Sequence, residues 1–279
     1  MMTLTARAVA STAPAAGYIG GKRNLARTIV PIIDSAESDG YAEPCVGMGG
    51  VFLRRRRRLS CEVINDVSRD VSTFFRVLQR HYDYFMNEMR FAISGRDEFE
   101  RLSAMPADML TDIERAVRFL YLQRLAFGGK VEGRNFGVDR SQGARFNVTK
   151  LRDQLERIHE RLAGVVIERL DYADFIRRYD RDGMLFYIDP PYWGCETDYG
   201  EDVFSRDDFA CMAEQLAGIR GKFLLSINDT PGVRAAFDDF HQVAVSTTYT
   251  ISRTALGANK AGELLVSNFA FAPPTAANS

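Results

Sequence analysis

The four residues Asp189-Pro190-Pro191-Tyr192 carry the clearest chemical pattern in the chain. They follow Met184–Ile188, an apolar run that predicts a short buried strand. Proline has no N–H group and fixes φ, so the strand must end here and the departing chain is stiff. In open α/β sheets, ligands bind at the carboxyl ends of the strands. A carboxylate, a free peptide carbonyl and an aromatic ring at such a place suit gripping a flat, amine-bearing ring and turning its nitrogen toward an electrophile.

A second pattern is the expected strand and glycine-rich turn at Tyr41–Gly50. Its candidate ligand contacts are Glu43, Cys45, Gly47 and Gly49. Glycines let the backbone approach a ligand where a Cβ would clash, and a helix following the turn would offer free N–H groups. A short strand at Cys61–Ile64 then precedes Asp66, where a carboxylate can accept both hydroxyls of a ribose. Because the glycine turn alone is a weak signal, the two features favour an adenosine-type cofactor without separating a dinucleotide from S-adenosylmethionine.

A third pattern, Tyr18-Ile-Gly20-Gly21-Lys22, precedes the first expected helix. Lys22 can meet a ligand carboxylate beside the glycine turn. Taken alone, however, the pattern is explained better by a flexible lead-in that carries a surface lysine.

The elements that must position these residues alternate between strand and helix in residues 17–75 and 165–270. Residues 76–164 show helical spacing, interrupted by the polar stretch Gly128–Asn147. We therefore predict a doubly wound α/β sheet, discontinuous in sequence, with a helical insert. The expected helix caps are Ser68, Thr149, Thr230 and Ser205, the last with Asp208 as a capping box. Residues 1–16 and 271–279 are expected to be disordered.

Bulk composition is that of an ordinary soluble protein, with 279 residues, 46% hydrophobic, 26% charged and a net charge of −1. The four cysteines include no CxxC pair, so we expect reduced thiols and no metal site. No apolar stretch approaches the roughly 18 residues of a membrane span, and the N-terminus lacks the apolar core of a targeting peptide. A cytoplasmic location is expected.

Positive charge is concentrated in the middle of the chain, where residues 115–161 hold eleven Lys or Arg and five acids. This distribution suits a surface that lies on phosphates, although charge alone favours a solvated helical surface. The run Arg54–Arg58 is expected near the end of a helix after the glycine turn, where solvation accounts for it.

Taken in this order, the three patterns resemble the Dam-like family of DNA adenine methylases, in its bacterial and phage-encoded forms. The resemblance covers about residues 17–268. Further matching segments are Phe119–Arg124, Arg169–Asp174, Leu225–Thr230, Ser252-Arg253 and Glu263–Leu265. It implies a class I S-adenosylmethionine-dependent methyltransferase (Rossmann-like) sheet, with residues 76–164 as the target-recognition domain. Double-stranded DNA would be the partner, and would associate the enzyme with the nucleoid.

The resemblance also implies which residues act. The cofactor S-adenosylmethionine would contact Tyr18, Gly20, Gly21, Lys22, Glu43, Cys45, Gly47, Gly49, Asp66, Asp171, Tyr172 and Asp189. A flipped-out adenine would give its two amine hydrogens to Asp189 and the Pro190 carbonyl, while Pro191 stiffens the turn and Tyr192 stacks on the ring. Catalysis would rest on orientation and charge stabilisation, without a metal or covalent intermediate.

Two points depart from the family pattern. Cys45 stands where the family has an aromatic residue, which bears on packing over the cofactor. The insert matches only at its start, so the target sequence cannot be inherited. Residues that could read bases or clamp phosphates are Arg124, Lys130, Arg134, Asn135 and Arg145.

Three alternatives remain open at this point. The first is a methyltransferase acting on the 4-amino group of cytosine or on an RNA base. The second is a dinucleotide-dependent oxidoreductase using Gly47, Gly49 and Asp66. The third is a DNA-binding protein that has lost catalysis. A role in restriction-modification, in regulation or in protecting a phage is compatible with the sequence, and so is a monomer.

Overall fold

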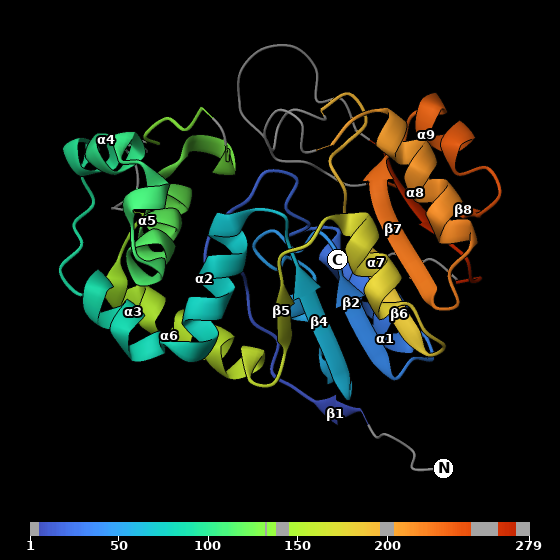
Figure 1. Cartoon of the computed structure of the whole chain (residues 1–279), viewed down its shortest axis with the longest axis horizontal. Helices are drawn as coiled ribbons and strands as arrows, with labels where there is room; N and C mark the ends of the chain where they lie inside the picture. The colour runs from blue at the N-terminus through green and yellow to red at the C-terminus, as the bar shows by residue number, and fades with distance from the viewer. Residues whose placement is uncertain (1–5, 132, 138–144, 196–203, 247–261, 272–279) are drawn as a thin grey trace.

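A twisted seven-stranded sheet forms the centre of the computed structural model, which describes residues 6–131, 133–137, 145–195, 204–246 and 262–271 (Figure 1). Its order in these residues is β5-β4-β2-β6-β7-β9-β8. The strands are β2 Gly40–Glu43, β4 Cys61–Asn65, β5 Val166–Glu168, β6 Met184–Ile188, β7 Lys222–Asn228, β8 His241–Ser246 and β9 Gly262–Ser267. All neighbours pair in parallel except β9, which is antiparallel to both β7 and β8. This confirms the predicted α/β sheet and the strand before Asp189.

Alternate side chains of the strands enter two separate hydrophobic clusters, one on each face. One face is covered by α1 (Ala26–Ser35). The other is covered by α7 (Tyr172–Tyr179), α8 (Asp207–Ala217) and α9 (Pro231–Ala236). Both faces of β6 are buried, which explains why its sequence is apolar throughout.

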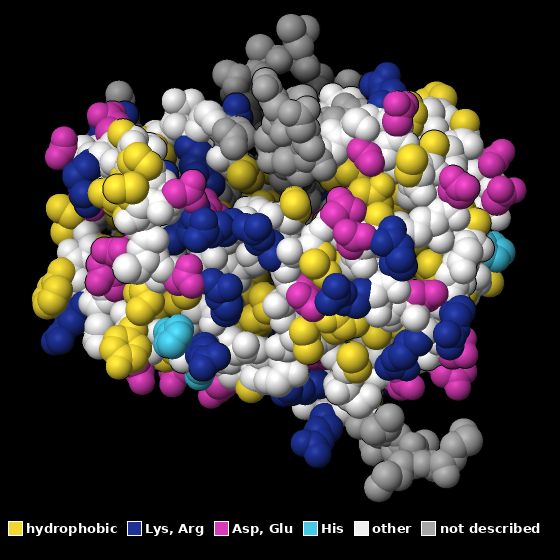
Figure 2. Space-filling model, in the orientation of Figure 1, with side chains coloured by type: hydrophobic (Ala, Val, Ile, Leu, Met, Phe, Trp, Pro, Cys, Tyr) yellow, Lys and Arg dark blue, Asp and Glu magenta, His cyan; other side chains and the backbone are white. Residues whose placement is uncertain are grey.

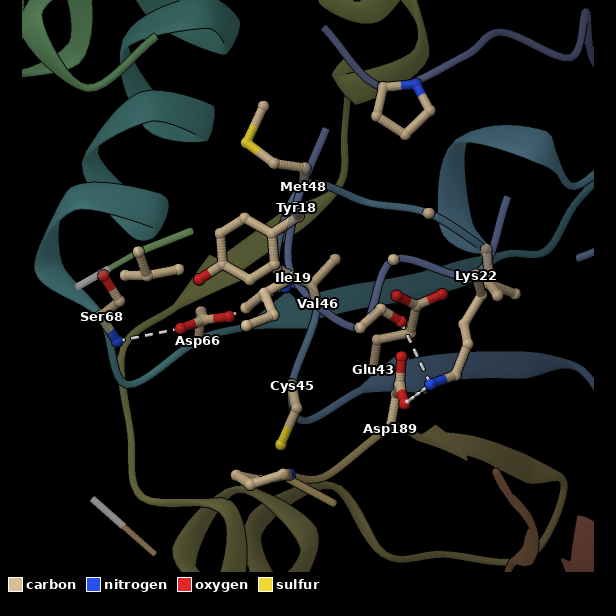
Figure 3. A pocket seen from close by; sticks show the side chains of 18 of the residues that line it. Tyr18, Ile19, Lys22, Glu43, Cys45, Val46, Met48, Asp66, Ser68 and Asp189 are labelled. Carbon is tan, nitrogen blue, oxygen red and sulfur yellow. Dashed lines mark hydrogen bonds and ion pairs between the residues drawn. The ribbon is translucent and has the colours of Figure 1, made fainter. Parts of the chain in front are cut away.

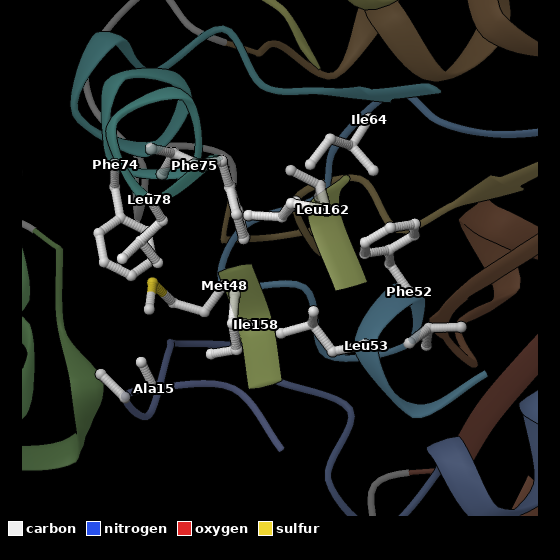
Figure 4. Close-up of a cluster of buried hydrophobic side chains, with 14 of the residues drawn as sticks. Ala15, Met48, Phe52, Leu53, Ile64, Phe74, Phe75, Leu78, Ile158 and Leu162 are labelled. Atoms are coloured by element: carbon white, nitrogen blue, oxygen red, sulfur yellow. The ribbon is translucent and has the colours of Figure 1, made fainter. Parts of the chain in front are cut away.

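Five helices form a lobe beside the sheet, at the left of Figure 1. They are α2 (Arg69–Arg80), α3 (Tyr82–Met89), α4 (Arg96–Ala104), α5 (Asp112–Leu125) and α6 (Val148–Leu162). Figure 4 shows that Phe74 and Leu78 of α2 and Ile158 of α6 pack with Phe52 and Ile64 from the sheet region. The helical part and one face of the sheet therefore share one hydrophobic core. No helix in the described ranges is long and apolar enough to cross a membrane.

The visible surface of both parts carries charges of either sign in close alternation (Figure 2). On α2, Arg69 pairs with Asp108 at 3.0 Å and Arg76 with Asp112 at 2.6 Å. In each pair an acid offsets the charge of the arginine. The number of arginines in the sequence therefore overstates the positive potential of this surface.

Two of the four expected helix caps are confirmed. The Ser68 hydroxyl accepts from the Val71 N–H, and the Thr230 hydroxyl from that of Val233. At Ser205 only half of the expected box is present: its N–H donates to Asp208 Oδ2 at 2.7 Å, but α8 has Arg206 as its N-cap and no side-chain cap. The expected Thr149 cap is wrong, because α6 begins two residues earlier, where the Asn147 side chain accepts from the Lys150 N–H at 3.2 Å. Asparagine serves as an N-cap as well as threonine does, so local propensity did not separate them.

The expected disordered start is wrong for residues 6–16, which lie along both parts of the molecule. Strand β1 (Arg7–Ala8) pairs with β3 (Arg57–Arg58), and the Thr12 N–H donates to the Leu53 carbonyl at 2.9 Å. The Ala15 side chain is buried in the core. Apolar contacts and backbone hydrogen bonds made by distant residues order this segment, and local composition does not reveal them. Residues 1–5 and 272–279 lie outside the described ranges.

The expected helix after the glycine turn is also corrected, because only a 3-10 turn, Phe52–Arg54, precedes β3. The arginine side chains here bind separate partners. Arg54 donates to the Gly50 carbonyl, Arg57 to that of Asp34 and Arg58 to that of Ala163. Arg55 is buried against Glu62 at 2.7 Å. These arginines therefore anchor the segment to neighbouring parts of the fold, and the expectation of simple solvation is wrong for them.

Candidate active site

A cavity of about 680 Å³ opens at the carboxyl ends of β2, β4 and β6 (Figure 3), a volume typical of small-molecule sites. Eleven residues predicted to bind a cofactor line it: Tyr18, Gly20, Gly21, Lys22, Glu43, Cys45, Gly47, Asp66, Asp171, Tyr172 and Asp189. The three sequence patterns, which are far apart in the chain, thus meet in one cavity. Pro191 lines it as well, whereas Pro190 and Tyr192 are not among its lining residues.

The glycine turn is closed by Asp66, at the left of Figure 3. The Gly47 N–H donates to Asp66 Oδ2 at 2.9 Å and the Ser68 N–H to Oδ1 at 3.0 Å. Burial raises the pKa of Asp66 to about 6, and the two N–H groups partly oppose this. Gly47 has φ +50, and a Cβ on it would lie 3.0 Å from the Tyr18 ring. This position therefore requires glycine.

Gly49, which the sequence assigned to the cofactor, is not among the cavity-lining residues. It has φ +76, and a Cβ there would lie 3.0 Å from the Leu53 side chain and 3.4 Å from Phe75. Close packing against the core accounts for this glycine. Cys45 does line the cavity, and burial raises the pKa of its thiol well above the usual value.

Lys22 and Asp189 form an ion pair at the right of Figure 3, with Nζ and Oδ1 2.6 Å apart. Lys22 is only 3% exposed, which excludes the surface lysine that its local sequence favoured. Its Nζ also donates to the Tyr192 hydroxyl at 2.8 Å and lies 4.4 Å from the centroid of that ring. Burial raises the pKa of Asp189 to about 6, and the charge of Lys22 lowers it. The Ser226 hydroxyl donates to the same Oδ1 at 3.4 Å.

Glu263 completes this group, and the sequence had marked it only as part of a matching segment. Its carboxylate accepts a hydrogen bond from the Tyr192 hydroxyl and lies 3.6 Å from Lys22 Nζ. The segment after Tyr192 is held as well, because Trp193 and Asn228 exchange two hydrogen bonds of 2.9 and 3.0 Å. An acid in an otherwise apolar strand was the only local signal for Glu263.

Glu43 forms the acidic floor of the cavity. It is fully buried, and this burial raises its pKa to about 8, opposed by the hydrogen bond from the Tyr41 hydroxyl and by the charge of Arg55. At pH 7 a carboxyl with this pKa is mostly protonated, so the charged groups of the inner wall are the paired Lys22 and Asp189. In the described part of the chain, no group of three or more His, Cys, Asp or Glu side chains is arranged to hold a metal ion.

The opposite end of the cavity is formed by Asp171 and Tyr172 at the start of α7. Asp171 caps this helix by accepting from the Ala173 N–H at 2.8 Å. Tyr172 is 5.8 Å, ring to ring, from Phe204, which also lines the cavity. Burial, followed by the charge of Asp208, raises the pKa of Tyr172. An aromatic wall of this kind suits a flat ring.

The basic residues proposed for DNA do not form one cluster. Arg124 lines the cavity, but its guanidinium donates to the carbonyls of Ala15 and Arg145, and it therefore joins the N-terminal segment to the helical part. Arg134 also lines the cavity and donates to Lys130 and Gln123. Lys130 and Asn135 are exposed, while Arg145 is half-buried.

The helical lobe touches the Tyr18 side of the cavity directly, a contact that the sequence did not indicate. The Ile19 N–H donates to the Gly129 carbonyl at 3.0 Å. The buried Gln123 amide donates to the carbonyls of Gly17 at 2.9 Å and Gly129 at 2.7 Å. Gly129 has φ +70, and a Cβ there would meet the Tyr18 nitrogen at 3.0 Å. The backbones of the two parts are therefore packed together beside Tyr18.

Comparison with known proteins agrees with this geometry. Residues 18–251 match the family model of D12 class N6 adenine-specific DNA methyltransferases. A DNA adenine methylase of Vibrio cholerae serotype O1 is 26% identical over 262 residues, which cover 89% of this chain and 93% of that protein. The type II methyltransferase M.CviBI of Paramecium bursaria Chlorella virus NC1A is 22% identical, over 81% of this chain and 87% of its own. The type II methyltransferase M1.LlaDCHI of Lactococcus lactis subsp. cremoris is 24% identical, over 92% and 95%.

Proposed function

Since the chain belongs to the D12 class of N6 adenine-specific DNA methyltransferases, we propose that S-adenosylmethionine is its methyl donor and that Asp189, Pro190 and Tyr192 hold the target adenine. The observation that carries the proposal is that Asp189 lines the same cavity as the Gly47 turn and Asp66. A catalytic carboxylate and a cofactor turn that share one cavity can bring an amine and a methyl donor together.

The donor groups of the cavity suit S-adenosylmethionine better than a dinucleotide. A dinucleotide site binds pyrophosphate through the N–H groups of its glycine turn, but here the Gly47 N–H donates to the Asp66 carboxylate. When bound, S-adenosylmethionine supplies a methyl group on a positively charged sulfur. We therefore set the oxidoreductase alternative aside.

The cofactor would be held along the whole cavity. Tyr18, the Gly20-Gly21 turn, Lys22 and Glu43 suit its methionine end, and Asp66 suits the ribose hydroxyls. Asp171 and Tyr172, together with Phe204, suit its adenine ring. The small Cys45 side chain leaves room beside the glycine turn.

The chain's own residues orient the adenine amine. Its lone pair is delocalised into the ring, so the amine is a weak nucleophile that must be turned toward the methyl group. Asp189 and the Pro190 carbonyl would accept its two hydrogens, and the Tyr192 ring would stack on the base. Lys22 favours the ionised form of Asp189, which is the form that can only accept hydrogen bonds. Above about pH 6 the carboxylate is ready for this task.

We propose residues 76–164, which form most of the helical lobe, as the target-recognition domain, with residues 17–75 and 165–270 as the catalytic domain; the boundary at 76 falls within α2. The bridge between Ala126 and Phe136 makes a hairpin that bears Lys130, Arg134 and Asn135. Phe127, which is 57% exposed on the same hairpin, is a further candidate for contact with bases. Duplex DNA would lie on this hairpin, with the adenine flipped toward Tyr192. The enzyme would act in the cytoplasm as a monomer.

Substitution of Asp189 tests the proposal. Asp189→Ala should lower transfer of tritiated methyl groups from S-adenosylmethionine to unmodified genomic DNA by about 10³-fold or more. Asp174→Ala, which removes an exposed carboxylate paired with Arg177, is the matched control and should leave turnover unchanged. Nucleoside analysis of the product should give 6-methyladenine. Full activity of Asp189→Ala, or 4-methylcytosine as the only product, would contradict the proposal.

A further inference from the structure

We propose that Glu263 is a positioning residue for methyl transfer, which holds the Tyr192 hydroxyl and the Lys22 ammonium in place from strand β9. This inference rests on the roles proposed for Asp189 and Tyr192. Strand β9 would thereby take part in the reaction. The Tyr192 hydroxyl and the Lys22 ammonium, both held by Glu263, determine how the Tyr192 ring and the Asp189 carboxylate meet the base.

Strand β9 brings Glu263 to the site from a distant part of the sequence. The strand is inserted between β7 and β8, and Glu263 lies opposite Asn228 in the antiparallel register. Leu265, two residues further along, packs in the same core cluster as Tyr187. Because side chains two apart on a strand point to one face, Glu263 faces the same side as Tyr187. It is 1% exposed.

A carboxylate in the interior is costly to desolvate unless charges and donors compensate it. The chain offers a direct comparison in Glu62, which is 3% exposed. Glu62 lies between Arg55, at 2.7 Å, and Arg161, at 2.6 Å, and does not line the cavity, so its partners join β4 to the helical part. Glu263 instead meets Lys22 and Tyr192, two groups of the proposed catalytic centre. Its position is therefore tied to that centre.

The contacts of Glu263 have two consequences for the reaction. The Tyr192 hydroxyl is held by Lys22 on one side and Glu263 on the other, which fixes the ring on which the base would stack. Lys22 is also shared between two carboxylates, at 2.6 Å from Asp189 and 3.6 Å from Glu263. Glu263 thus draws part of the ammonium charge away from Asp189 and leaves this carboxylate a stronger acceptor.

The shared cation gives the proposal a pH signature. Groups from several elements face Asp189: Lys22 before α1, Glu43 at the end of β2, Cys45 after β2, Tyr187 on β6, Ser226 on β7 and Glu263 on β9. The negative charge of Glu263 raises the pKa of Asp189, and Lys22 lowers it. Removal of the Glu263 charge leaves Lys22 to Asp189 alone. The pKa of Asp189 must then fall, and the acidic limb of the pH–rate profile must move to lower pH.

Glu263→Gln is the main variant, because it keeps size and an acceptor oxygen but removes the charge. We expect kcat with unmodified genomic DNA to fall about tenfold, and about 100-fold in Glu263→Ala, which also releases Tyr192. The acidic limb should shift downward in Glu263→Gln. Binding of S-adenosylmethionine in calorimetric titration should stay within about twofold, since Glu263 does not line the cavity. Glu62→Gln, the matched control, should lower thermal stability without moving the limb.

Tyr192→Phe separates the action through the hydroxyl from a general loss of folding. If Glu263 acts through that hydroxyl, the losses of kcat in Glu263→Gln and Tyr192→Phe should combine less than additively in the double variant. An acidic limb that does not move in Glu263→Gln, or fully additive losses, would overturn the proposal. Asp189→Ala tells the two levels apart: if it remains inactive while Glu263→Gln behaves as wild type, only the role of Glu263 fails.

Discussion

The floor of the cavity and the hairpin at residues 126–137 use charged side chains in opposite ways. On the floor, Lys22, Glu43 and Asp189 are packed at the ends of the sheet with Glu263 behind them, and the charges of Lys22 and Glu263 act on the pKa of Asp189. On the hairpin side, Lys130 is exposed, and Arg124 is occupied by backbone carbonyls. Buried charges need partners, whereas exposed charges do not. Only on the floor, therefore, does the role of a charged side chain depend closely on its exact position.

This difference teaches how to interpret the basic residues. An arginine near a proposed DNA surface can support the fold, as the contacts of Arg124 indicate, and its guanidinium is then less available to DNA phosphates. A buried lysine such as Lys22 is instead fixed by the groups around it, Asp189 and Tyr192. The variants below test where this boundary lies.

The largest effect is expected from Lys22→Met. Loss of the ammonium leaves Asp189 buried without its cation, so the pKa of this carboxyl must rise above about 6. Turnover at pH 7 should fall by about 100-fold or more. The acidic limb should move to higher pH, opposite to its movement in Glu263→Gln. A pH–rate series on both variants checks the signs, and a limb that moves the same way in both would contradict the charge network.

Gln123→Ala tests the contact that joins the two regions. Gln123 is 1% exposed and its amide serves the Gly17 and Gly129 carbonyls, so its loss should cost about 1–3 kcal/mol of unfolding free energy. Binding of S-adenosylmethionine should weaken too, because Gly17 lines the cavity.

Gln154→Ala is the matched control for this contact. Its amide donates to the Ala13 and Pro14 carbonyls, but it is half-buried, so water can replace it. Denaturant unfolding of the two variants should differ clearly. Equal stabilities would mean that the Gln123 contact does not hold the parts together.

Glu43→Gln should stabilise the ligand-free protein at pH 8 by up to about 4 kcal/mol, while it weakens cofactor binding. Burial raises the pKa of Glu43 from 4.5 to about 8, so the folded state binds a proton that the unfolded state has released. The free energy of unfolding of the wild type therefore falls as pH rises from 4.5 to about 8. Urea unfolding at pH 5 and pH 8 measures the difference between wild type and variant. A variant that gains as much at pH 5 as at pH 8 would exclude this cause.

The smallest effects concern the hairpin. Lys130→Ala should reduce the slope of log K against log salt for duplex DNA by about one and leave the melting temperature unchanged. Arg124→Ala should do the reverse, lowering the melting temperature with little change of slope, because its guanidinium holds Ala15 and Arg145. Salt titrations with fluorescent duplexes decide this, and an equal loss of slope in Arg124→Ala would contradict the distinction between a supporting arginine and an exposed lysine.

The sequence predicted site residues correctly where they directly follow a strand whose carboxyl end opens into the cavity. Met184–Ile188 is apolar throughout because both its faces are covered, and Asp189 follows at the carboxyl end where the sheet opens. The turn at Gly47 and the carboxylate of Asp66 could be placed for the same reason. These positions depend on short segments and on the general geometry of parallel sheets.

Sequence was not informative where the deciding contact comes from far away. Lys22 looks like a surface residue until Asp189 and Tyr192 cover it. Glu263 belongs to the site only because β9 runs antiparallel between two strands, an arrangement that local periodicity does not encode. The roles of Arg54–Arg58 and Gln123 depend likewise on backbone carbonyls that the neighbouring sequence does not predict.

The inserted strand also has a consequence for biosynthesis. β9 follows the other described strands in sequence, yet it hydrogen-bonds to β7 on one edge and β8 on the other. A nascent chain that has not yet released Gly262–Ser267 from the ribosome leaves those two edges apart and lacks the Glu263 carboxylate. We therefore expect methylating activity to appear late in synthesis, and fragments that stop short of this strand to be inactive.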